Sequence, residues 1–481
     1  MMAEYETVIG LEVHVELATK TKIFCGCSTK FGARPNENTC PVCMGMPGTL
    51  PVLNKKVVEY AIAVGLALNC DISRYSKFDR KNYFYPDNPQ NYQISQLYMP
   101  ICTNGFVNVT AGEGSKKIRI HEIHMEEDAG KLIHDDEEDV SLIDYNRAGV
   151  PLIEIVSEPD MSNAEEVIAY LKKLKTVIGY LGASDCKLQE GSMRADVNLS
   201  VRPVGKKELG TRTEMKNLSS FRAISRAIEN EKKRQIKLIE NGERVIQQTR
   251  HWDDKKGESY SMRSKEDAMD YRYFPEPDLM PLIISEKWID EIKANEPEMA
   301  EQKIERYILQ FNIPRYDAEQ ITSEKKFTEI FEETVDLGAN PKKVSNWIMG
   351  ETMRILKEEK DEPENLNISP KHLAKLIEIV DNNTINSSVA KDVFLQVYKN
   401  DVDPEVFVRE NSLAQVSDAG ELEGIILRIL SENPKSVGDY MAGKKKAIGF
   451  LVGQTMKATK GTADPAMVNK LLTKLLNGYG N

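Results

Sequence analysis

Residues 10–17, G-L-E-V-H-V-E-L, place acidic and imidazole side chains two positions apart. In an extended strand this spacing puts Glu12, His14 and Glu16 on one face and the four aliphatic side chains on the other. Burial against a core accounts for the aliphatic face. Carboxylates beside an imidazole offer the oxygen and nitrogen ligands that bind a hard divalent cation. A half-exposed edge strand with scattered charges would show the same pattern, so the strand alone leaves both interpretations open.

Two further segments place acidic side chains in or beside apolar strands. Residues 118–131, I-R-I-H-E-I-H-M-E-E-D-A-G-K, end a predicted strand with Glu126 and Glu127, directly followed by a third acid. Consecutive acids are costly to hold together unless water or a cation neutralises them. Residues 151–159, P-L-I-E-I-V-S-E-P, carry Glu154 inside an apolar run. This carboxylate is either a ligand from a third strand or a buried, paired acid.

Basic side chains that could contact a phosphate lie close to these acidic segments. Residues 77–96, K-F-D-R-K-N-Y-F-Y-P-D-N-P-Q-N-Y-Q-I-S-Q, include Lys81 and show no clear period. Their composition excludes core and predicts a binding loop, or else a surface loop packed by its own tyrosines. Residues 187–201 predict a strand in which Arg194 and other polar residues alternate with apolar ones, as an edge strand would also show. Lys216 lies in T-R-T-E-M-K-N, shortly before a predicted helix.

Four of the seven cysteines form two closely spaced pairs, C-G-C and C-P-V-C, which are separated by twelve residues: Cys25, Cys27, Cys40 and Cys43. Four thiolates from two turns can close a tetrahedron around Zn²⁺ and leave no open position, so we expect a structural zinc. Pro41 and Gly45 stand where tight turns need them. A pair of redox-active or free thiols is the alternative interpretation.

The elements that carry these residues indicate an α+β fold. With 481 residues, of which 41% are hydrophobic, the chain is long enough for about two to four domains. We expect a sheet-containing domain at 1–295, with a zinc knuckle at 25–43, and within it a Tyr- and Arg-rich loop at 270–278 near the same site. Helical periodicity dominates afterwards, which predicts a helical domain at 296–410 and a small α-helical tail domain at 411–481.

Charge is unevenly distributed along the chain. The net charge is −11, whereas residues 434–481 contain eight Lys and two Asp, a balance of +6 that leaves −17 for residues 1–433. Such an asymmetry suggests a tail that faces nucleic acid on an acidic body. In this tail Lys444, Lys445 and Lys446 are expected to open a helix. No basic and apolar leader and no membrane-length apolar run is found, which predicts a cytoplasmic protein.

Several catalytic motifs are missing from the sequence. It contains no G-x-x-x-x-G-K-[ST] phosphate loop, no G-x-G-x-x-G fingerprint, no G-x-S-x-G elbow and no Gly/Ser-rich run typical of amidases. Acid-lined strands with Lys and Arg nearby would instead suit Mg²⁺-assisted phosphoryl transfer, which depends on positioning and charge neutralisation. The residues alone therefore predict an ATP- or phosphate-using metal enzyme with a helical, partly basic C-terminal region.

Four motifs together resemble one family closely: G-L-E-V-H-V-E-L, K-F-D-R-K-N-Y-F-Y-P-D-N-P, H-M-E-E-D-A-G-K and P-L-I-E-I-V-S-E-P-D. They look like the B subunit of the bacterial-type aspartyl/glutamyl-tRNA amidotransferase, and the resemblance covers essentially the whole chain. It implies a catalytic cradle domain with a curved sheet related to glutamine synthetase, a helical domain, and a tail that engages tRNA.

The resemblance also implies a reaction, cofactors and partners. ATP phosphorylates the side-chain carboxylate of Glu-tRNA(Gln) or Asp-tRNA(Asn), and ammonia then displaces phosphate to give Gln-tRNA or Asn-tRNA. Mg²⁺ is the implied metal. The implied partners are an amidase A subunit, which frees ammonia from glutamine, and a small C subunit. An amidase partner agrees with the missing nucleophile motif in this chain.

Carried over onto this sequence, the family's metal-binding strand positions match Glu12, His14, Glu126 and Glu127, with Glu154 as a further candidate. Our own candidates for phosphate contacts are Lys81, Arg194 and Lys216, because they lie in or beside the motifs. The four-cysteine cluster is not present in every family member, which supports a structural zinc.

Two other functions are weighed against this one. A tRNA-binding scaffold would have no use for the acidic strand face, and a zinc-dependent hydrolase would need an open position on the zinc. The related archaeal subunit, which handles only Glu-tRNA, normally carries an inserted middle domain for which this chain has no space. Which of the two tRNAs is the natural substrate is not encoded in the sequence.

Overall fold

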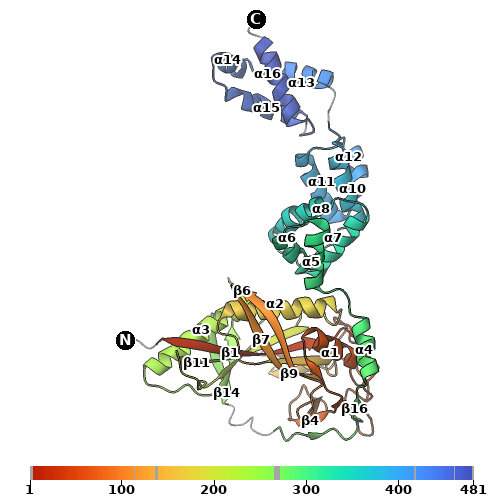
Figure 1. The fold of residues 1–481 in the computed structure, drawn as a ribbon, viewed down its shortest axis with the longest axis vertical. Coiled ribbons are helices and arrows are strands. Elements are labelled where there is room, and N and C mark those ends of the chain that lie inside the picture. Colours follow the sequence, from red (N-terminus) through yellow and green to blue (C-terminus); the bar gives the residue numbers. More distant parts are fainter. Residues whose placement is uncertain are drawn as a thin grey trace. The chain divides into compact units, whose positions relative to one another are not determined.

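The computed structural model describes residues 4–112, 114–135, 139–264, 271–415, 419–459 and 461–478. The chain divides into two compact units, Met1–Met299 and Ala300–Asn481 (Figure 1). The first unit is rich in strands and the second consists of helices, so the predicted α+β class is confirmed. The division falls shortly after the predicted boundary at 295. The likeness to glutamine synthetase stays a prediction.

A nine-stranded sheet forms the centre of the first unit. Its order is β14 (Glu258–Ser264), β13 (Gln248–Asp253), β12 (Thr213–Lys216), β11 (Met193–Pro203), β1 (Tyr5–Glu16), β10 (Pro151–Ser157), β7 (Gly114–Glu127), β6 (Cys102–Ala111) and β2 (Asp71–Ile72). Neighbouring strands are antiparallel except for β12 and β13, which are parallel. The N-terminal strand thus lies in the middle of the sheet.

Helices cover one face of this sheet. The helices α1 (Lys55–Ala67), α2 (Ala164–Tyr180) and α3 (Phe221–Glu240) share one hydrophobic cluster with the aliphatic side chains of β1, β7, β10 and β11. Asn54 caps α1, because its side chain accepts a hydrogen bond from the Lys56 amide. The alternation predicted for residues 10–17 is confirmed: Leu11, Val13 and Val15 are buried in this core, which leaves the intervening polar residues on the opposite face.

Smaller elements surround the sheet. They are β3 (Tyr75–Ser76) with β16 (Leu282–Ile283), β8 (Lys131–Asp135) with β9 (Val140–Asp144), the three strands β15 (Phe274–Pro275), β4 (Asp79–Asn82) and β5 (Tyr92–Ser95), and helix α4 (Glu286–Ala294).

The interpretation of residues 77–96 as a loop that cannot be core is therefore wrong. The segment contains β4 and β5, which pair antiparallel from Asp79 opposite Ser95 to Asn82 opposite Tyr92. Asp79 is fully buried, because its carboxylate accepts hydrogen bonds from the backbone amides of Leu97 and Tyr98. Buried hydrogen bonds of this kind let a polar sequence enter an interior.

The second unit holds two hydrophobic clusters. The first cluster is built from α5 (Ala300–Phe311), α6 (Arg315–Thr322), α7 (Lys325–Asp336), α8 (Pro341–Trp347), a π-helical segment (Ile348–Thr352), α9 (Met353–Glu359), a 3₁₀ turn (Pro363–Asn365), α10 (Pro370–Asp381), α11 (Ser387–Asn400) and α12 (Pro404–Glu410). The other comprises α13 (Ala419–Glu432), α14 (Pro434–Met441), α15 (Ala447–Ala458) and α16 (Pro465–Gly478). The division of this unit into domains at 296–410 and 411–481 stays a prediction. Among the described residues, no helix is both long and apolar enough to span a membrane.

Candidate active site

The uncovered face of the nine-stranded sheet carries the polar residues of five neighbouring strands. Strand register places Asp196 opposite Glu12, Glu154 opposite His14, and His124 opposite Glu154. A cavity of about 900 Å³ lies over this face and is lined by Glu12, His14, His124 and Glu154. Its wall also includes Lys81, Glu126, Glu214 and Lys216, with tyrosines from the β13–β14 hairpin and from the segment after residue 270: Tyr260, Tyr271 and Tyr273.

One group of possible metal ligands in this cavity consists of His14, Glu126 and Glu154, whose ligand atoms lie within 4.8 Å of one another. Nε2 of His14 is 3.3 Å from Oε2 of Glu154 and 3.6 Å from Oε1 of Glu126. Nε2 of His124 approaches the same Glu154 oxygen to 3.1 Å. Two carboxylates and an imidazole on rigid strands suit a hard divalent cation.

The two imidazoles and Glu154 perturb one another. Burial lowers the pKa of His124, but the Glu154 charge and the nearby Glu122 and Glu126 outweigh it and raise that pKa well above its usual value. Burial likewise raises the pKa of Glu154, yet the histidines hold it well below its usual value. The buried Nδ1 of His124 forms no hydrogen bond and lies 3.4 Å from Oε1 of Glu122. The ionised Glu154 is thus neutralised by protons on the imidazoles, which a divalent cation bound here would displace.

A second group consists of Glu12, Asp196 and Glu214, again within 4.8 Å of one another. Nζ of Lys216 lies 2.6 Å from Oδ2 of Asp196 and 3.1 Å from Oε1 of Glu214. The Asn198 amide donates to Glu12 at 3.0 Å. Burial first, and then the charges of Glu154, Glu214 and Asp196, raise the pKa of Glu12. Neighbouring donors therefore hold the three carboxylates in place, and the single ammonium of Lys216 does not fully neutralise their negative charge.

Of the three predicted phosphate contacts, Lys81 and Lys216 line the cavity, whereas Arg194 does not. Lys81 lines the cavity, and its Nζ lies 4.9 Å from the centre of the Tyr271 ring. Burial lowers the pKa of Lys81, but Glu126 and neighbouring groups raise it overall, so the side chain is a cation. The side chain of Arg194, in contrast, pairs with Asp128 at 3.0 Å and is not among the residues that line the cavity.

Glu127 is not brought together with the other predicted metal ligands. Adjacent residues of a strand point to opposite faces, so Glu127 leaves β7 on the face away from Glu126. There its Oε1 accepts hydrogen bonds from the Gln90 side chain at 2.6 Å and from the Ile94 amide at 3.0 Å. It lines a separate cavity of about 240 Å³. Burial raises the pKa of Glu127 to about 7.

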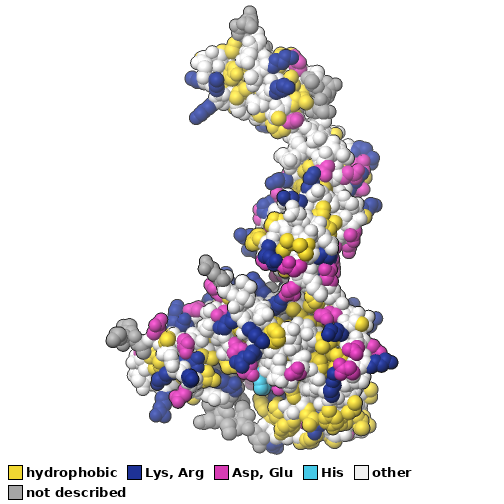
Figure 2. Space-filling view, viewed as in Figure 1, with side chains coloured by type: hydrophobic (Ala, Val, Ile, Leu, Met, Phe, Trp, Pro, Cys, Tyr) yellow, Lys and Arg dark blue, Asp and Glu magenta, His cyan; other side chains and the backbone are white. Residues whose placement is uncertain are grey.

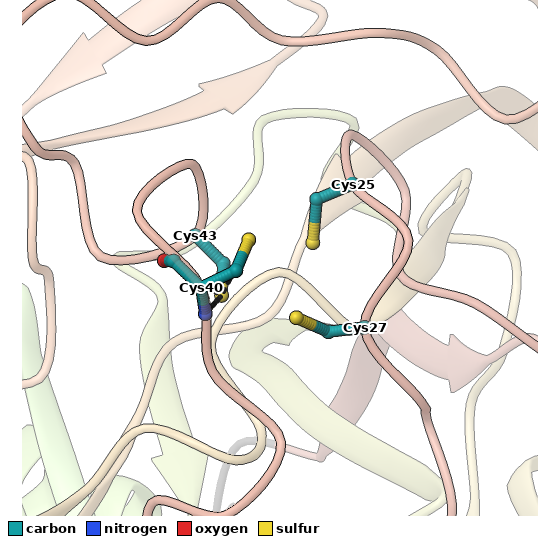
Figure 3. Close-up of side chains that lie close together, drawn as sticks. All are labelled: Cys25, Cys27, Cys40 and Cys43. Atoms are coloured by element: carbon teal, nitrogen blue, oxygen red, sulfur yellow. Dashed lines mark hydrogen bonds between the residues drawn. The ribbon is translucent and has the colours of Figure 1, made fainter.

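The four predicted zinc ligands lie together in the structure. Their sulfur atoms point toward a common centre (Figure 3) and lie within 4.8 Å of one another: Cys25, Cys27, Cys40 and Cys43. The sulfurs of Cys40 and Cys43 are 3.9 Å apart, and thiolates bound to one tetrahedral zinc are about 3.8 Å apart. Gly45 adopts a φ of 63°, and a Cβ there would lie 2.9 Å from Cβ of Gln90, which explains the glycine in this turn.

A buried lysine supports this cysteine cluster. Nζ of the fully buried Lys22 lies 3.5 Å from Sγ of Cys43 and donates to the Tyr145 carbonyl at 3.1 Å. A hydrogen bond from Cys25, the Cys40 backbone and the Lys22 charge outweigh burial and lower the pKa of the Cys43 thiol to about 5. A thiolate is the form that binds zinc.

The three tail lysines precede a helix, whereas the sequence predicted that they open it. Helix α15 begins at Ala447, and Lys446 is its N-cap residue without a side-chain capping bond. All three lysines are exposed, and Nζ of Lys444 pairs with Asp439 at 3.0 Å. Helix α14, which the sequence did not predict, ends shortly before them. They still stand at the positive end of a helix dipole.

Comparison with known proteins gives one consistent result. The family model described as the GatB/GatE catalytic domain matches residues 7–290, and the model described as the GatB domain matches residues 329–476. The B subunits of the aspartyl/glutamyl-tRNA(Asn/Gln) amidotransferases of Agathobacter rectalis and Lachnospira eligens are each 65% identical to this chain over 99% of it and all of their own length. That of Caldicellulosiruptor bescii is 57% identical over 98% of this chain and 99% of its own. The chain belongs to the family of amidotransferase B subunits.

Membership in this family confirms the resemblance inferred from the four motifs, which lie in the part matched by the catalytic-domain model. The residues that sequence reasoning missed lie in the same part of the chain. Asp196 and Glu214 complete the second acidic group, and His124 joins the first. The signal for each was present, since Asp196 alternates with Arg194 and Glu214 stands two residues before Lys216. Only the strand order brings them to Glu12.

Proposed function

We propose that this chain is the subunit of an aminoacyl-tRNA amidotransferase that activates the misacylated tRNA. It phosphorylates the side-chain carboxylate of Glu-tRNA(Gln) or Asp-tRNA(Asn) with ATP, and it transfers ammonia to give Gln-tRNA(Gln) or Asn-tRNA(Asn). The observation that carries the proposal is the cavity over one sheet face, where two acidic groups lie beside the cations Lys81 and Lys216. The family's names describe relatives that act on the aspartyl and glutamyl forms of these tRNAs.

The chemistry has two steps. A side-chain carboxylate oxygen of the substrate attacks the γ-phosphorus of ATP, so that an acyl phosphate forms and ADP leaves. Ammonia then attacks the acyl carbon and inorganic phosphate leaves. In the first step Lys81 and Lys216 contact phosphate oxygens, while the walls of the cavity hold the two reactants in line. Arg194 does not line the cavity, so we assign it to holding Asp128 instead of a phosphate.

Mg²⁺ would be held by Glu12, His14, Glu126 and Glu154, with Asp196 and Glu214 beside Glu12. When bound, it supplies charge neutralisation for phosphate oxygens. The residues present fit this role, because their carboxylates are clustered and remain short of positive charge. The Cys25, Cys27, Cys40 and Cys43 cluster would hold a Zn²⁺ whose role is structural, since four thiolates leave no open position.

Ammonia would come from a glutaminase partner, the A subunit, which is assembled with a small C subunit. The first unit offers an apolar surface for such a partner. Figure 2 shows hydrophobic side chains gathered where Figure 1 places β4 and β16. Ile283 pairs with Tyr75 across the β3–β16 ladder, and the exposed fractions of Ile283, Met280 and Phe84 are 70%, 85% and 88%. Apolar groups this exposed are typical of surfaces that a partner covers.

The tRNA would be held by the tail as well as by the cavity. Lys444, Lys445 and Lys446 stand together on the surface at the start of α15, where a phosphate backbone would relieve their conflict with the helix dipole. A tRNA substrate also supports the expectation of a cytoplasmic enzyme.

The decisive test is the amidation of charged tRNA by the reconstituted three-subunit complex, with tRNA(Gln) and tRNA(Asn) assayed separately. Glu12→Gln should lower tRNA-dependent ADP release and amidation on the order of 10²- to 10³-fold, while the partner's glutaminase activity remains. Glu6→Gln is the matched control, because Glu6 lies on the same strand but pairs with Arg202 at 2.6 Å. Full amidation by Glu12→Gln would overturn the proposal and favour a scaffold role.

A further inference from the structure

The ammonium group of Lys216 lies between carboxylates of the second acidic group, where their negative charges need a cation. Its Nζ lies 2.6 Å from Oδ2 of Asp196 and 3.1 Å from Oε1 of Glu214, and these two carboxylates lie within 4.8 Å of that of Glu12. The lysine and both acids come from neighbouring strands of the sheet, β11 and β12. The ammonium therefore contacts two of the three carboxylates that a divalent cation at this position would use.

This placement conflicts with a fixed role for Lys216. An ammonium hydrogen-bonded to two carboxylates is not free to contact a phosphate. Conversely, Mg²⁺ binds carboxylate oxygens at about 2.1 Å and must displace a donor that already holds them. The side chain can move, because 41% of it is exposed and its four-carbon stem is flexible.

We infer that Lys216 is an exchangeable internal cation: it holds Asp196 and Glu214 together before a divalent cation binds, and it moves to the nucleotide phosphates when that cation takes its place. The inference rests on the proposed function and adds to it the order in which Lys216 changes partners. Lys216 is a positioning residue for the metal and a phosphate contact afterwards, and the two roles exclude one another in time.

The exchange couples two binding events. A divalent cation alone must displace Lys216 without giving it a new partner, so it binds the second group weakly. A triphosphate offers the lysine a new partner and so makes the acids available. By thermodynamic reciprocity each ligand then promotes binding of the other by the same factor, and couplings of this kind are usually about 5- to 150-fold.

A comparison with Lys81 separates the effect of direct contact with the carboxylates from the effect of the cavity's net charge. It lines the same cavity, and its Nζ lies 4.9 Å from the centre of the Tyr271 ring. Among the ion pairs of the described residues Lys81 forms none. Removing its charge changes the net charge of the cavity as much as removing that of Lys216, but it frees no carboxylate.

The test is a titration of the full-length chain with Mn²⁺ as a Mg²⁺ probe, followed by electron paramagnetic resonance of free Mn²⁺, with and without the ATP analogue AMP-PNP. In the wild type we expect one Mn²⁺ to bind alone and a second to bind tightly only with AMP-PNP. In Lys216→Gln the second Mn²⁺ should bind about 5- to 150-fold more tightly without the analogue, and AMP-PNP should add little further affinity. Lys216→Arg should restore weak binding of the second ion.

Lys81→Gln is the matched control: without AMP-PNP it should bind the second Mn²⁺ as weakly as the wild type, because this substitution frees no carboxylate. Equal affinity of wild type and Lys216→Gln for the second ion would overturn the exchange, as would undiminished enhancement by AMP-PNP in that variant. Neither result would contradict the proposed function. In contrast, a wild type that binds no Mn²⁺ even with AMP-PNP would overturn the proposed function and the exchange together.

Discussion

The first unit contains two clusters of metal-ligand side chains: the cysteine cluster at Cys25–Cys43 and the acidic cavity over the open sheet face. They differ in the type of donor, in the elements that carry the donors and in the space beside them. The cysteine cluster joins four identical donors from two turns around one centre. The cavity has two groups of donors on rigid strands, one with an imidazole and two carboxylates and the other with three carboxylates, beside about 900 Å³ of space.

The comparison shows how the donor set indicates the role of a site. Four thiolates satisfy zinc completely and leave no position for a substrate. Three donors in each group leave positions for water or phosphate, and strands fix them where a reacting molecule can approach. We therefore expect damage to the cysteine cluster to reduce stability, and damage to the cavity to reduce ligand binding and chemistry.

The largest expected effect is loss of the zinc. Cys40→Ser removes one of the four ligands, and because structural zinc contributes on the order of 10 kcal/mol to the folding of small zinc domains, we expect the free energy of unfolding to fall by about 4 kcal/mol or more. Denaturant unfolding and metal analysis measure this. The turnover of the molecules that remain folded should stay near the wild-type value. A zinc-free wild type, or a variant that is stable but inactive, would contradict the distinction between the two clusters.

The next effect concerns Glu127, which lies on the face of the sheet opposite the cavity. Its folded-state pKa, about 7, is raised from 4.5 by burial, so its contribution to stability is present below the unfolded pKa and is lost as pH rises through the folded one. In Glu127→Gln the side chain no longer titrates, so this pH-dependent loss of stability disappears. Relative to wild type, the variant should therefore gain about 3 kcal/mol in the free energy of unfolding between about pH 4 and pH 8.

Denaturant unfolding of both proteins across this pH range measures the gain, with Glu4→Gln as an exposed control. A difference between wild type and Glu127→Gln that does not change with pH would show that burial does not govern this carboxyl group.

A smaller effect distinguishes the two neighbouring glutamates by metal binding. Glu126→Gln removes a ligand atom from the group with His14 and Glu154, and we expect Mn²⁺ affinity to fall about 10- to 100-fold, as for other losses around metal sites. Glu127→Gln should leave that affinity unchanged, because its carboxylate lies on the other face. Calorimetric titration with Mn²⁺ compares them. Equal losses in both variants would restore the sequence-based expectation that both residues bind Mg²⁺.

The smallest effect lies outside both clusters. Replacing Lys444, Lys445 and Lys446 together by Ala should weaken tRNA binding and reduce the salt dependence of its affinity by up to about three counterions. The partner's glutaminase activity without tRNA should be unchanged. Filter binding at several salt concentrations measures both quantities. Wild-type affinity with a wild-type salt slope would mean that the tail does not contact the tRNA backbone.

Local patterns predicted from the sequence agree with the structure where a single element determines them. The alternation of residues 10–17 and the helical C-terminal half both follow from spacing within single elements. Pairing between distant elements was not predictable in this way. Asp196 and Glu214 reach Glu12 only because β11 and β12 lie next to β1 in the sheet.

Three predictions differ from the structure, and the first two differ for specific physical reasons. Glu127 was grouped with Glu126 although adjacent strand residues point to opposite faces, so alternation alone could have separated them. The strands β4 and β5 are not evident in the sequence because their burial depends on hydrogen bonds that no local pattern shows, such as those that Oδ2 of Asp79 accepts. The tail lysines were assigned to α15 although it begins at Ala447.

The central position of β1 has a consequence for biosynthesis. This strand leaves the ribosome before either of its neighbours, since β10 and β11 begin only at Pro151 and Met193. At the usual rates of translation β1 therefore waits roughly 10 to 30 s for a partner on either side. During that time its aliphatic face is a target for chaperones. A nascent chain that stops before Met193 carries Glu12 and His14 but neither acidic partner of Glu12, so incomplete chains cannot assemble the second acidic group.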